Sequence, residues 1–125
     1  MNISKINSFQ DLEAWQKGKE LVIEIYNISK RFPKEETFGI ISQLRRASLS
    51  APANIAEGFA RYHFRDKVRI YYIARGSLAE VHNYLILAVS LDYINEVESN
   101  TLICKCNQVG MLINGLIRSI DRQKI

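Results

Sequence analysis

Apolar residues recur every three or four positions along most of the chain, which is the spacing of amphipathic helices. The first stretch ends at Pro33 and places on one face Ala14, Gly18, Leu21, Ile25, Ile28 and Phe32. A later stretch repeats the spacing at Tyr71, Ala74, Leu78, Val81, Leu85 and Ala88. The last stretch has it at Leu102, Cys106, Val109, Ile113, Leu116 and Ile120. The pattern contains no strand signal and predicts an all-α protein.

Polar residues mark where these helices are expected to begin. Ser8 with Asp11 three positions later resembles a capping box, and so does Asn95 with Glu98. In both pairs the first side chain can accept a hydrogen bond from the helix backbone and the second can return one. Thr37, after a polar connection, is the expected N-cap of a second helix. Helices are therefore predicted to start near 11, 37 and 95.

The second predicted helix runs to about residue 61 and has an unusual composition. It carries Pro52 in its interior, where a bend is expected because proline lacks an amide donor. Its apolar positions are mostly small: Ala47, Ala51, Ala53, Ala56 and Gly58. Small residues allow a neighbouring backbone to approach closely, so we expect this helix to be the most tightly packed.

The connections between the predicted helices are short, and the third helix starts near Arg65 after a turn at residues 62–64. Short connections cannot return the chain to the other end of a bundle, so consecutive helices must alternate in direction. The sequence therefore predicts an antiparallel up-down-up-down four-helix bundle. One domain accounts for residues 1–125.

A polar stripe accompanies the small residues of the second helix at Gln43, Arg46, Ser50, Asn54, Glu57 and Arg61. In a hairpin that turns near His63, residues whose numbers add up to about 126 lie at the same height. This register pairs Arg46 with Glu80, Asn54 with Tyr72, and Glu57 with Arg69. We expect at least partial burial of Arg46, Asn54 and Glu80. The alternative is an ordinary solvated helix face.

The net charge of +4 is concentrated in one segment. Asp66 is the only acidic residue in a window that contains Arg61, Arg65, Lys67, Arg69 and Arg75. Cations in the first turn of a helix oppose its dipole, and like charges four positions apart repel one another. Bound phosphates would relieve both effects. The window predicts a nucleic-acid-binding patch, and a solvated basic turn is the alternative.

Candidate catalytic and metal-binding chemistry is sparse. Glu57 and Glu80 are the only paired carboxylates near the second helix, and no nucleophile or histidine stands at a suggestive spacing. Cys104 and Cys106 point roughly 200° apart on a helix, so they are expected to be reduced packing residues. We expect no enzyme activity, cofactor or metal. The longest uncharged runs, 81–91 and 106–117, are too short to span a bilayer, so a cytoplasmic location without membrane contact is expected.

Five motifs occur in an order that identifies a family. They are Asp11-Leu12 with Trp15, Phe32-Pro33 with Glu35, Ser42 to Arg46 (SQLRR), Pro52 to Gly58 (PANIAEG), and Tyr72 to Glu80 (YIARGSLAE). Together they resemble the four-helix-bundle proteins encoded in intervening sequences of bacterial 23S ribosomal RNA genes, which are related to the accessory variability determinant proteins of diversity-generating retroelements. One departure is His63, where similar proteins tend to have Ser or another capping residue.

The resemblance implies a ring-like homopentamer and, for the retroelement relatives, binding to RNA or DNA and to a reverse transcriptase. Apolar residues outside the predicted core faces also favour an oligomer: Phe9, Ile23, Phe38, Phe59 and Tyr93. Two functional hypotheses follow. The first is a non-enzymatic oligomeric accessory factor that binds nucleic acid through the basic patch. The second is a homo-oligomeric protein–protein adaptor with no nucleic-acid role.

Overall fold

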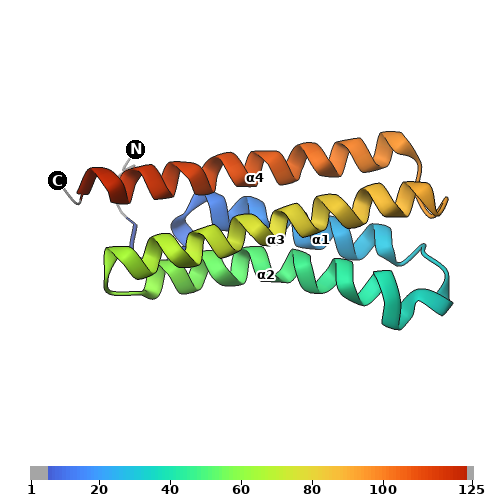
Figure 1. Cartoon of the computed structure of the whole chain (residues 1–125), viewed down its shortest axis with the longest axis horizontal. Helices are drawn as coiled ribbons and strands as arrows, with labels where there is room; N and C mark the ends of the chain where they lie inside the picture. Colours follow the sequence, from blue (N-terminus) through green and yellow to red (C-terminus); the bar gives the residue numbers. More distant parts are fainter. Residues whose placement is uncertain (1–5, 124–125) are drawn as a thin grey trace.

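A computed structural model describes residues 6–123 and contains four long α-helices. They are α1 (Glu13–Ser29), α2 (Ser42–Ala60), α3 (Phe64–Ser90) and α4 (Glu96–Gln123). Successive helices run in opposite directions and lie side by side (Figure 1). Each packs against the next, and α4 packs back against α1, which closes the bundle. The predicted all-α, up-down-up-down four-helix bundle is confirmed.

The two predicted capping boxes are both present, but they cap different kinds of helix. Asn95 and Glu98 exchange backbone-to-side-chain hydrogen bonds of 2.8 and 3.3 Å at the start of α4. Ser8 and Asp11 make the same reciprocal contact around a short 3-10 helix, η1 (Phe9–Asp11). α1 begins only after Leu12, which cannot cap with its side chain. The first α-helix therefore starts one turn later than its polar signal.

The prediction that Thr37 caps the second helix is wrong. Between α1 and α2 the chain forms a 3-10 turn, η2 (Lys34–Glu36), and a π-helical turn, η3 (Thr37–Ile41). The Glu36 carboxylate accepts a hydrogen bond from the Ile40 amide (3.4 Å), which is the contact expected of a cap. The Thr37 hydroxyl instead donates backwards, to a carbonyl of η2. The polar connection is thus longer than predicted, and α2 begins at Ser42.

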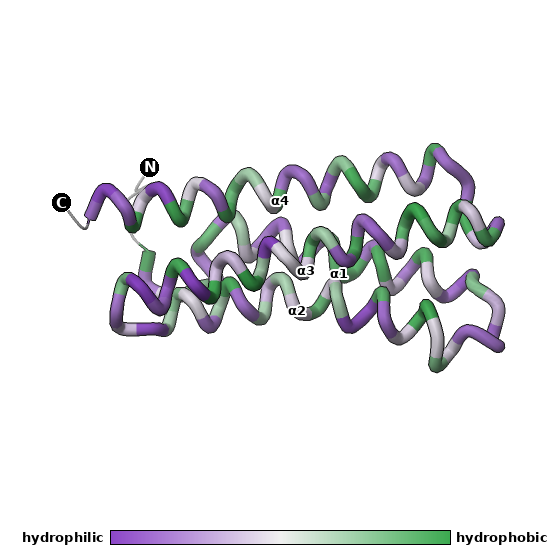
Figure 2. The backbone as a smooth tube through the Cα atoms, in the orientation of Figure 1, coloured by the Kyte–Doolittle hydropathy of each residue, from purple (hydrophilic) through white to green (hydrophobic). Residues whose placement is uncertain are grey.

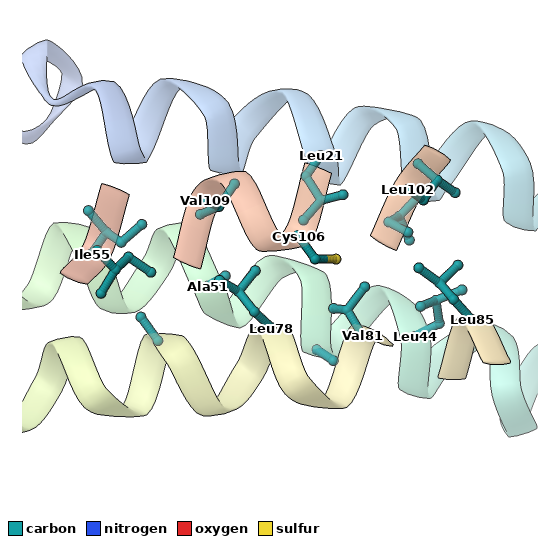
Figure 3. Packing of buried hydrophobic residues seen from close by; sticks show 14 of the residues in the cluster. Leu21, Leu44, Ala51, Ile55, Leu78, Val81, Leu85, Leu102, Cys106 and Val109 are labelled. Atoms are coloured by element: carbon teal, nitrogen blue, oxygen red, sulfur yellow. The ribbon is translucent and has the colours of Figure 1, made fainter. Parts of the chain in front are cut away.

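The core is a single apolar cluster along the bundle axis, to which all four helices contribute (Figure 3). Every predicted core position of α1 and α3 is buried. In α4 the periodicity slips by one position near the end, because Ile117 is buried in place of the predicted Leu116, which is only half-buried. Green and purple alternate along each helix in Figure 2, as expected when one face of each is apolar.

α1 and α2 approach closely where a glycine meets the internal proline. A Cβ atom built on Gly18 would lie 3.4 Å from Cβ of Pro52, at the short edge of ordinary contact. Pro52 is buried within α2, and Ala47 and Ala51 are fully buried on the same helix. Three of the five predicted small residues, Ala47, Ala51 and Gly58, thus serve close packing within the bundle, whereas Ala56 is half-buried and Ala53 is exposed.

Candidate nucleic-acid interface

The turn between α2 and α3 forms one end of the bundle (Figure 1). The residues of this turn include aromatic and basic ones. Arg61 and His63 have extended backbones, which separates the two helices. Tyr62, between them, is 88% exposed. His63 occupies the N-cap position of α3 without a side-chain capping bond, so the departure from Ser leaves this turn uncapped by its side chain. The turn is drawn in hydrophilic colours in Figure 2.

Two of the predicted binding residues, Arg65 and Arg69, are exposed on α3 one helical turn apart. Neither makes an ion pair within residues 6–123. The like-charged pair repels itself by a few tenths of a kcal/mol on the usual helix-pair scale. These two guanidinium groups are therefore available to an anionic ligand.

Lys67, which is also predicted to bind nucleic acid, contacts α2. Its ammonium group donates hydrogen bonds to the carbonyls of Phe59 (2.7 Å) and Gly58 (3.4 Å) in the last turn of α2. Its Nζ also lies 5.5 Å from the centre of the Phe59 ring. Partial burial lowers the pKa of the Lys67 ammonium. Lys67 closes the C-terminal end of α2, and we do not count it among the groups that face a ligand.

The remaining predicted binding residues are already engaged on the surface. Arg61 donates to the Glu57 carboxylate one turn earlier in α2, and this hydrogen bond raises the pKa of the guanidinium. Arg75 lies over the Tyr72 ring, with 5.2 Å between its Cζ atom and the ring centre. Arg61 still belongs to the basic end, whereas Arg75 lies further along α3.

The fold adds two cations that the sequence reasoning missed. Arg118 and Arg122 are exposed near the end of α4. The C-terminal end of α4 lies at the same end of the bundle as the start of α3 (Figure 1). Leu116 and Gln123 of α4 line a cavity together with Lys67 and Tyr71 of α3. The predicted antiparallel topology could have identified both arginines, because it places the C-terminal end of the fourth helix at the same end of the bundle as the turn between the second and third helices.

The two ends of the bundle carry opposite charge. Among residues 6–123, the end with the α2–α3 turn has six cations and five carboxylates: Arg61, Arg65, Lys67, Arg69, Arg118 and Arg122 against Asp11, Glu13, Glu57, Asp66 and Asp121. The opposite end has three cations and five carboxylates: Lys30, Arg31 and Lys34 against Glu35, Glu36, Asp92, Glu96 and Glu98. We call the first group of eleven, in which cations are in the majority, the basic end. A polyanion is attracted to it and repelled from the other end.

The predicted pairing of Arg46 with Glu80 is present, but the predicted burial is wrong. Arg46 Nη2 lies 3.4 Å from Glu80 Oε2, joining α2 to α3. The two side chains are 56% and 47% exposed. The long side chains bridge the helices from outside, because the close approach of the backbones leaves no room for them between the helices. This contact is a surface ion pair.

The other two predicted pairs of the stripe are replaced by contacts within α2. Asn54, which is half-buried as expected, donates to the backbone carbonyl (2.8 Å) and the hydroxyl (3.0 Å) of Ser50 instead of meeting Tyr72. Glu57 is exposed and binds Arg61 instead of Arg69. Local partners one turn away are favoured because they need no precise fit between two helices.

The cysteines offer no paired chemistry. Cys106 is buried in the core, as predicted for a packing residue, and burial raises the pKa of its thiol to about 12. Cys104 is exposed, so the same prediction is wrong for it. Within residues 6–123 no group of three or more His, Cys, Asp or Glu side chains is placed to hold a metal ion. None of the helices in the same range combines the length and the hydropathy that crossing a membrane requires.

The family of 23S rRNA-intervening sequence proteins matches residues 10–115 of the chain. Among solved structures, a protein of unknown function from the S23 ribosomal protein family of Bacteroides thetaiotaomicron is similar, with a TM-score of 0.76 and 23% sequence identity. The match covers 83% of this chain and 97% of that one. At this identity the likeness concerns the fold. No curated protein matches the chain.

Proposed function

Because the chain belongs to the family of 23S rRNA-intervening sequence proteins, we propose that it is a non-enzymatic accessory factor that binds nucleic acid through its basic end. The proposal concerns RNA or DNA as the ligand, since phosphate charge is common to both. The binding groups are Arg65 and Arg69, supported by Arg61, Arg118 and Arg122.

The observation that carries the proposal is the position of Arg65 and Arg69. Two exposed cations stand one turn apart on α3 without an ion pair in the described range, at the end of the bundle where positive charge prevails. Their mutual repulsion is relieved when a phosphate lies between them. Surface cations with a purely solubilising role are more often interspersed with carboxylates.

The test compares two double variants of equal charge. Arg65→Gln with Arg69→Gln removes two cations from the basic end, and Lys30→Gln with Lys34→Gln removes two exposed cations from the opposite end. Binding of fluorescent RNA and DNA oligonucleotides is measured by anisotropy over a range of salt concentrations. We expect the first variant to bind more weakly to all sequences and with a slope against log salt that is smaller by about 1–2. Equal binding by both variants and the wild type contradicts the proposal.

A homo-oligomer, a pentamer by the family resemblance, is the second part of the proposal. Of the five residues from which an interface was predicted, Phe9, Phe59 and Tyr93 pack against the core, whereas Ile23 and Phe38 are exposed. Further exposed apolar residues lie on the outer face of α3: Tyr72, Ile73, Ile86 and Leu87, with Gly76 and Ala79 and the polar Glu80 and Asn83 exposed between them. Apolar residues around small ones on one helix face favour contact with another copy.

Light scattering tests this part. Ile86→Gln should lower the mass of the assembly, while Val97→Gln at the start of α4, where the side chain is 75% exposed, should not. A stable wild-type monomer at micromolar concentration contradicts it. If the oligomer forms and no nucleic acid binds at low salt, the protein is an adaptor. The reverse transcriptase that the resemblance implies as a partner stays a prediction.

A further inference from the structure

Tyr62 is a large aromatic side chain that the bundle does not use. It is 88% exposed at the tip of the α2–α3 turn, and its ring meets His63 edge-on, with 5.0 Å between ring centres and an angle of 84°. Tyr62, His63 and Phe64 border a shallow depression at the same tip. Perpendicular rings do not cover one another face to face, so a flat surface at the tip stays open.

The neighbours of this ring determine which ligand fits it. Arg65 and Arg69 lie on the first two turns of α3, immediately after the aromatic tip, and Arg61 precedes it. An aromatic face next to guanidinium groups matches a nucleotide, whose base stacks and whose phosphate binds the cations. In a duplex the bases are stacked inside and the ring cannot reach their faces. An unpaired base can turn outward onto the ring.

A second exposed aromatic residue shows that exposure alone does not point to nucleic acid. Phe38 is 93% exposed in η3, at the opposite end of the bundle. Its neighbours in sequence include Glu35 and Glu36, in the part of the molecule where carboxylates outnumber cations. A nucleic-acid backbone is repelled there. Phe38 is therefore a matched control for Tyr62.

We propose that the α2–α3 tip is a stacking site for an unpaired nucleobase, with Tyr62 as the platform and Arg65 and Arg69 as the phosphate ligands, so that the protein prefers single-stranded nucleic acid to duplex. This inference rests on the proposed function and narrows its ligand to strands with accessible bases. Stacking on one aromatic side chain corresponds to about five- to 150-fold in Kd.

The experiment measures Kd for unstructured oligo-U and oligo-dT and for RNA and DNA duplexes of equal length, at one fixed salt concentration. The proteins are the wild type, Tyr62→Ala, Tyr62→Phe and Phe38→Ala, each first shown to be folded by circular dichroism. Tyr62→Ala should weaken single-strand binding at least about fivefold and change duplex binding less than about twofold. Tyr62→Phe keeps the ring, and Phe38→Ala leaves the tip intact, so both should bind as the wild type does.

The outcomes separate the two proposals. If the wild type binds single strands and duplexes equally and Tyr62→Ala changes neither, the stacking site is refuted while nucleic-acid binding by the basic end stands. If Tyr62→Ala weakens the binding of single strands and of duplexes to the same extent, the ring does not select unpaired bases and the stacking site is refuted. If the wild type binds none of the four ligands, both proposals fall. If Tyr62→Ala loses affinity for oligo-U or for oligo-dT but keeps its affinity for the duplexes, the result supports the stacking site.

Discussion

The hydroxyl groups of Ser50 on α2 and Ser77 on α3 are joined by a hydrogen bond of 2.8 Å. One turn further along, Arg46 and Glu80 form an ion pair between the same two helices. Both contacts have the register of a hairpin that turns near His63. The short buried pair holds the helices at close distance, since Ser77 is 4% exposed and Ser50 half-buried. The longer Arg46 and Glu80 side chains bridge the same two helices on the exposed surface.

The exposure of Arg46 and Glu80 sets the expected strength of their coupling. Surface ion pairs contribute about 0–1 kcal/mol, because water and salt screen the charges and two long side chains lose freedom. A double-mutant cycle with Arg46→Ala and Glu80→Ala should therefore give a coupling energy below about 1 kcal/mol, instead of the 3–5 kcal/mol of a buried pair. Thermal unfolding at low and high salt measures it. A larger, salt-independent value contradicts the surface description.

Gly58 and Gly76 should respond in opposite directions to alanine. A Cβ atom on Gly58 would lie 2.6 Å from Cε1 of the buried Tyr71 ring, whereas one on Gly76 would meet nothing within 4 Å. Alanine favours a helix by up to about 1 kcal/mol over glycine. Overpacking a core costs about 1–3 kcal/mol. We expect Gly58→Ala to destabilise the bundle and Gly76→Ala to stabilise the single subunit, as measured by chemical denaturation at protein concentrations at which light scattering shows a monomer. A stabilising Gly58→Ala would show that the Tyr71 ring moves aside without cost.

These cases show which features the sequence determines. The helix seams and the hairpin register follow from periodicity and chain connectivity, so the core positions of α1 and α3 and the meeting of Arg46 with Glu80 were predictable. Burial of a polar side chain depends on how closely two backbones approach, which is a property of the assembled bundle. The sequence therefore indicated which residues of α2 and α3 lie opposite each other. It did not indicate that the Arg46 side chain remains exposed to solvent.

The candidate site shows the same division. The local excess of cations identified Arg65 and Arg69, because charge density can be read along the chain. Sequence alone could not show that Lys67 turns back to the carbonyls of α2, since any lysine near a helix end has several partners within reach. Arg118 was not predicted as a site residue, because the positive charge that it adds to the basic end depends on where α4 packs in the bundle. The segment 61–75 does not include the cations of α4, so it cannot by itself show the charge of the whole end of the bundle.

Lys67 and Arg65 are expected to differ in their effect on stability although they are two residues apart. Lys67 donates to the Phe59 carbonyl, which α2 leaves without a backbone partner, and to the Gly58 carbonyl, which also accepts from the Arg61 amide. Arg65 makes no ion pair in the described range. Lys67→Met should cost roughly 0.5–1.5 kcal/mol, the range of a typical hydrogen bond. Arg65→Gln should leave the free energy of unfolding unchanged or slightly raised, because it removes repulsion from Arg69. Denaturant titrations of both variants check this. Equal destabilisation would assign Arg65 a structural role as well.

Glu98 gives the bundle an acid-sensitive contact at its other end. The pKa of Glu98 lies below its ordinary value of 4.5, chiefly because Arg31 donates a hydrogen bond to the carboxylate and further because the Asn95 amide does. The unfolded chain thus binds this proton more tightly than the folded one. The stabilisation is fully present above the unfolded pKa and is lost as the pH falls through the folded pKa. Thermal unfolding between about pH 6 and pH 2 should show this loss as part of the overall decline.

Two variants isolate the contribution of this contact. Arg31→Gln removes the main donor and should return the pKa of Glu98, followed by NMR of its carboxyl carbon, towards 4.5. Glu96→Gln removes an exposed carboxylate from the same turn of α4 and should leave the pKa of Glu98 nearly unchanged. A wild-type pKa at or above 4.5 would mean that the Arg31 contact does not hold in solution. In that case the acid dependence of Arg31→Gln would match that of the wild type.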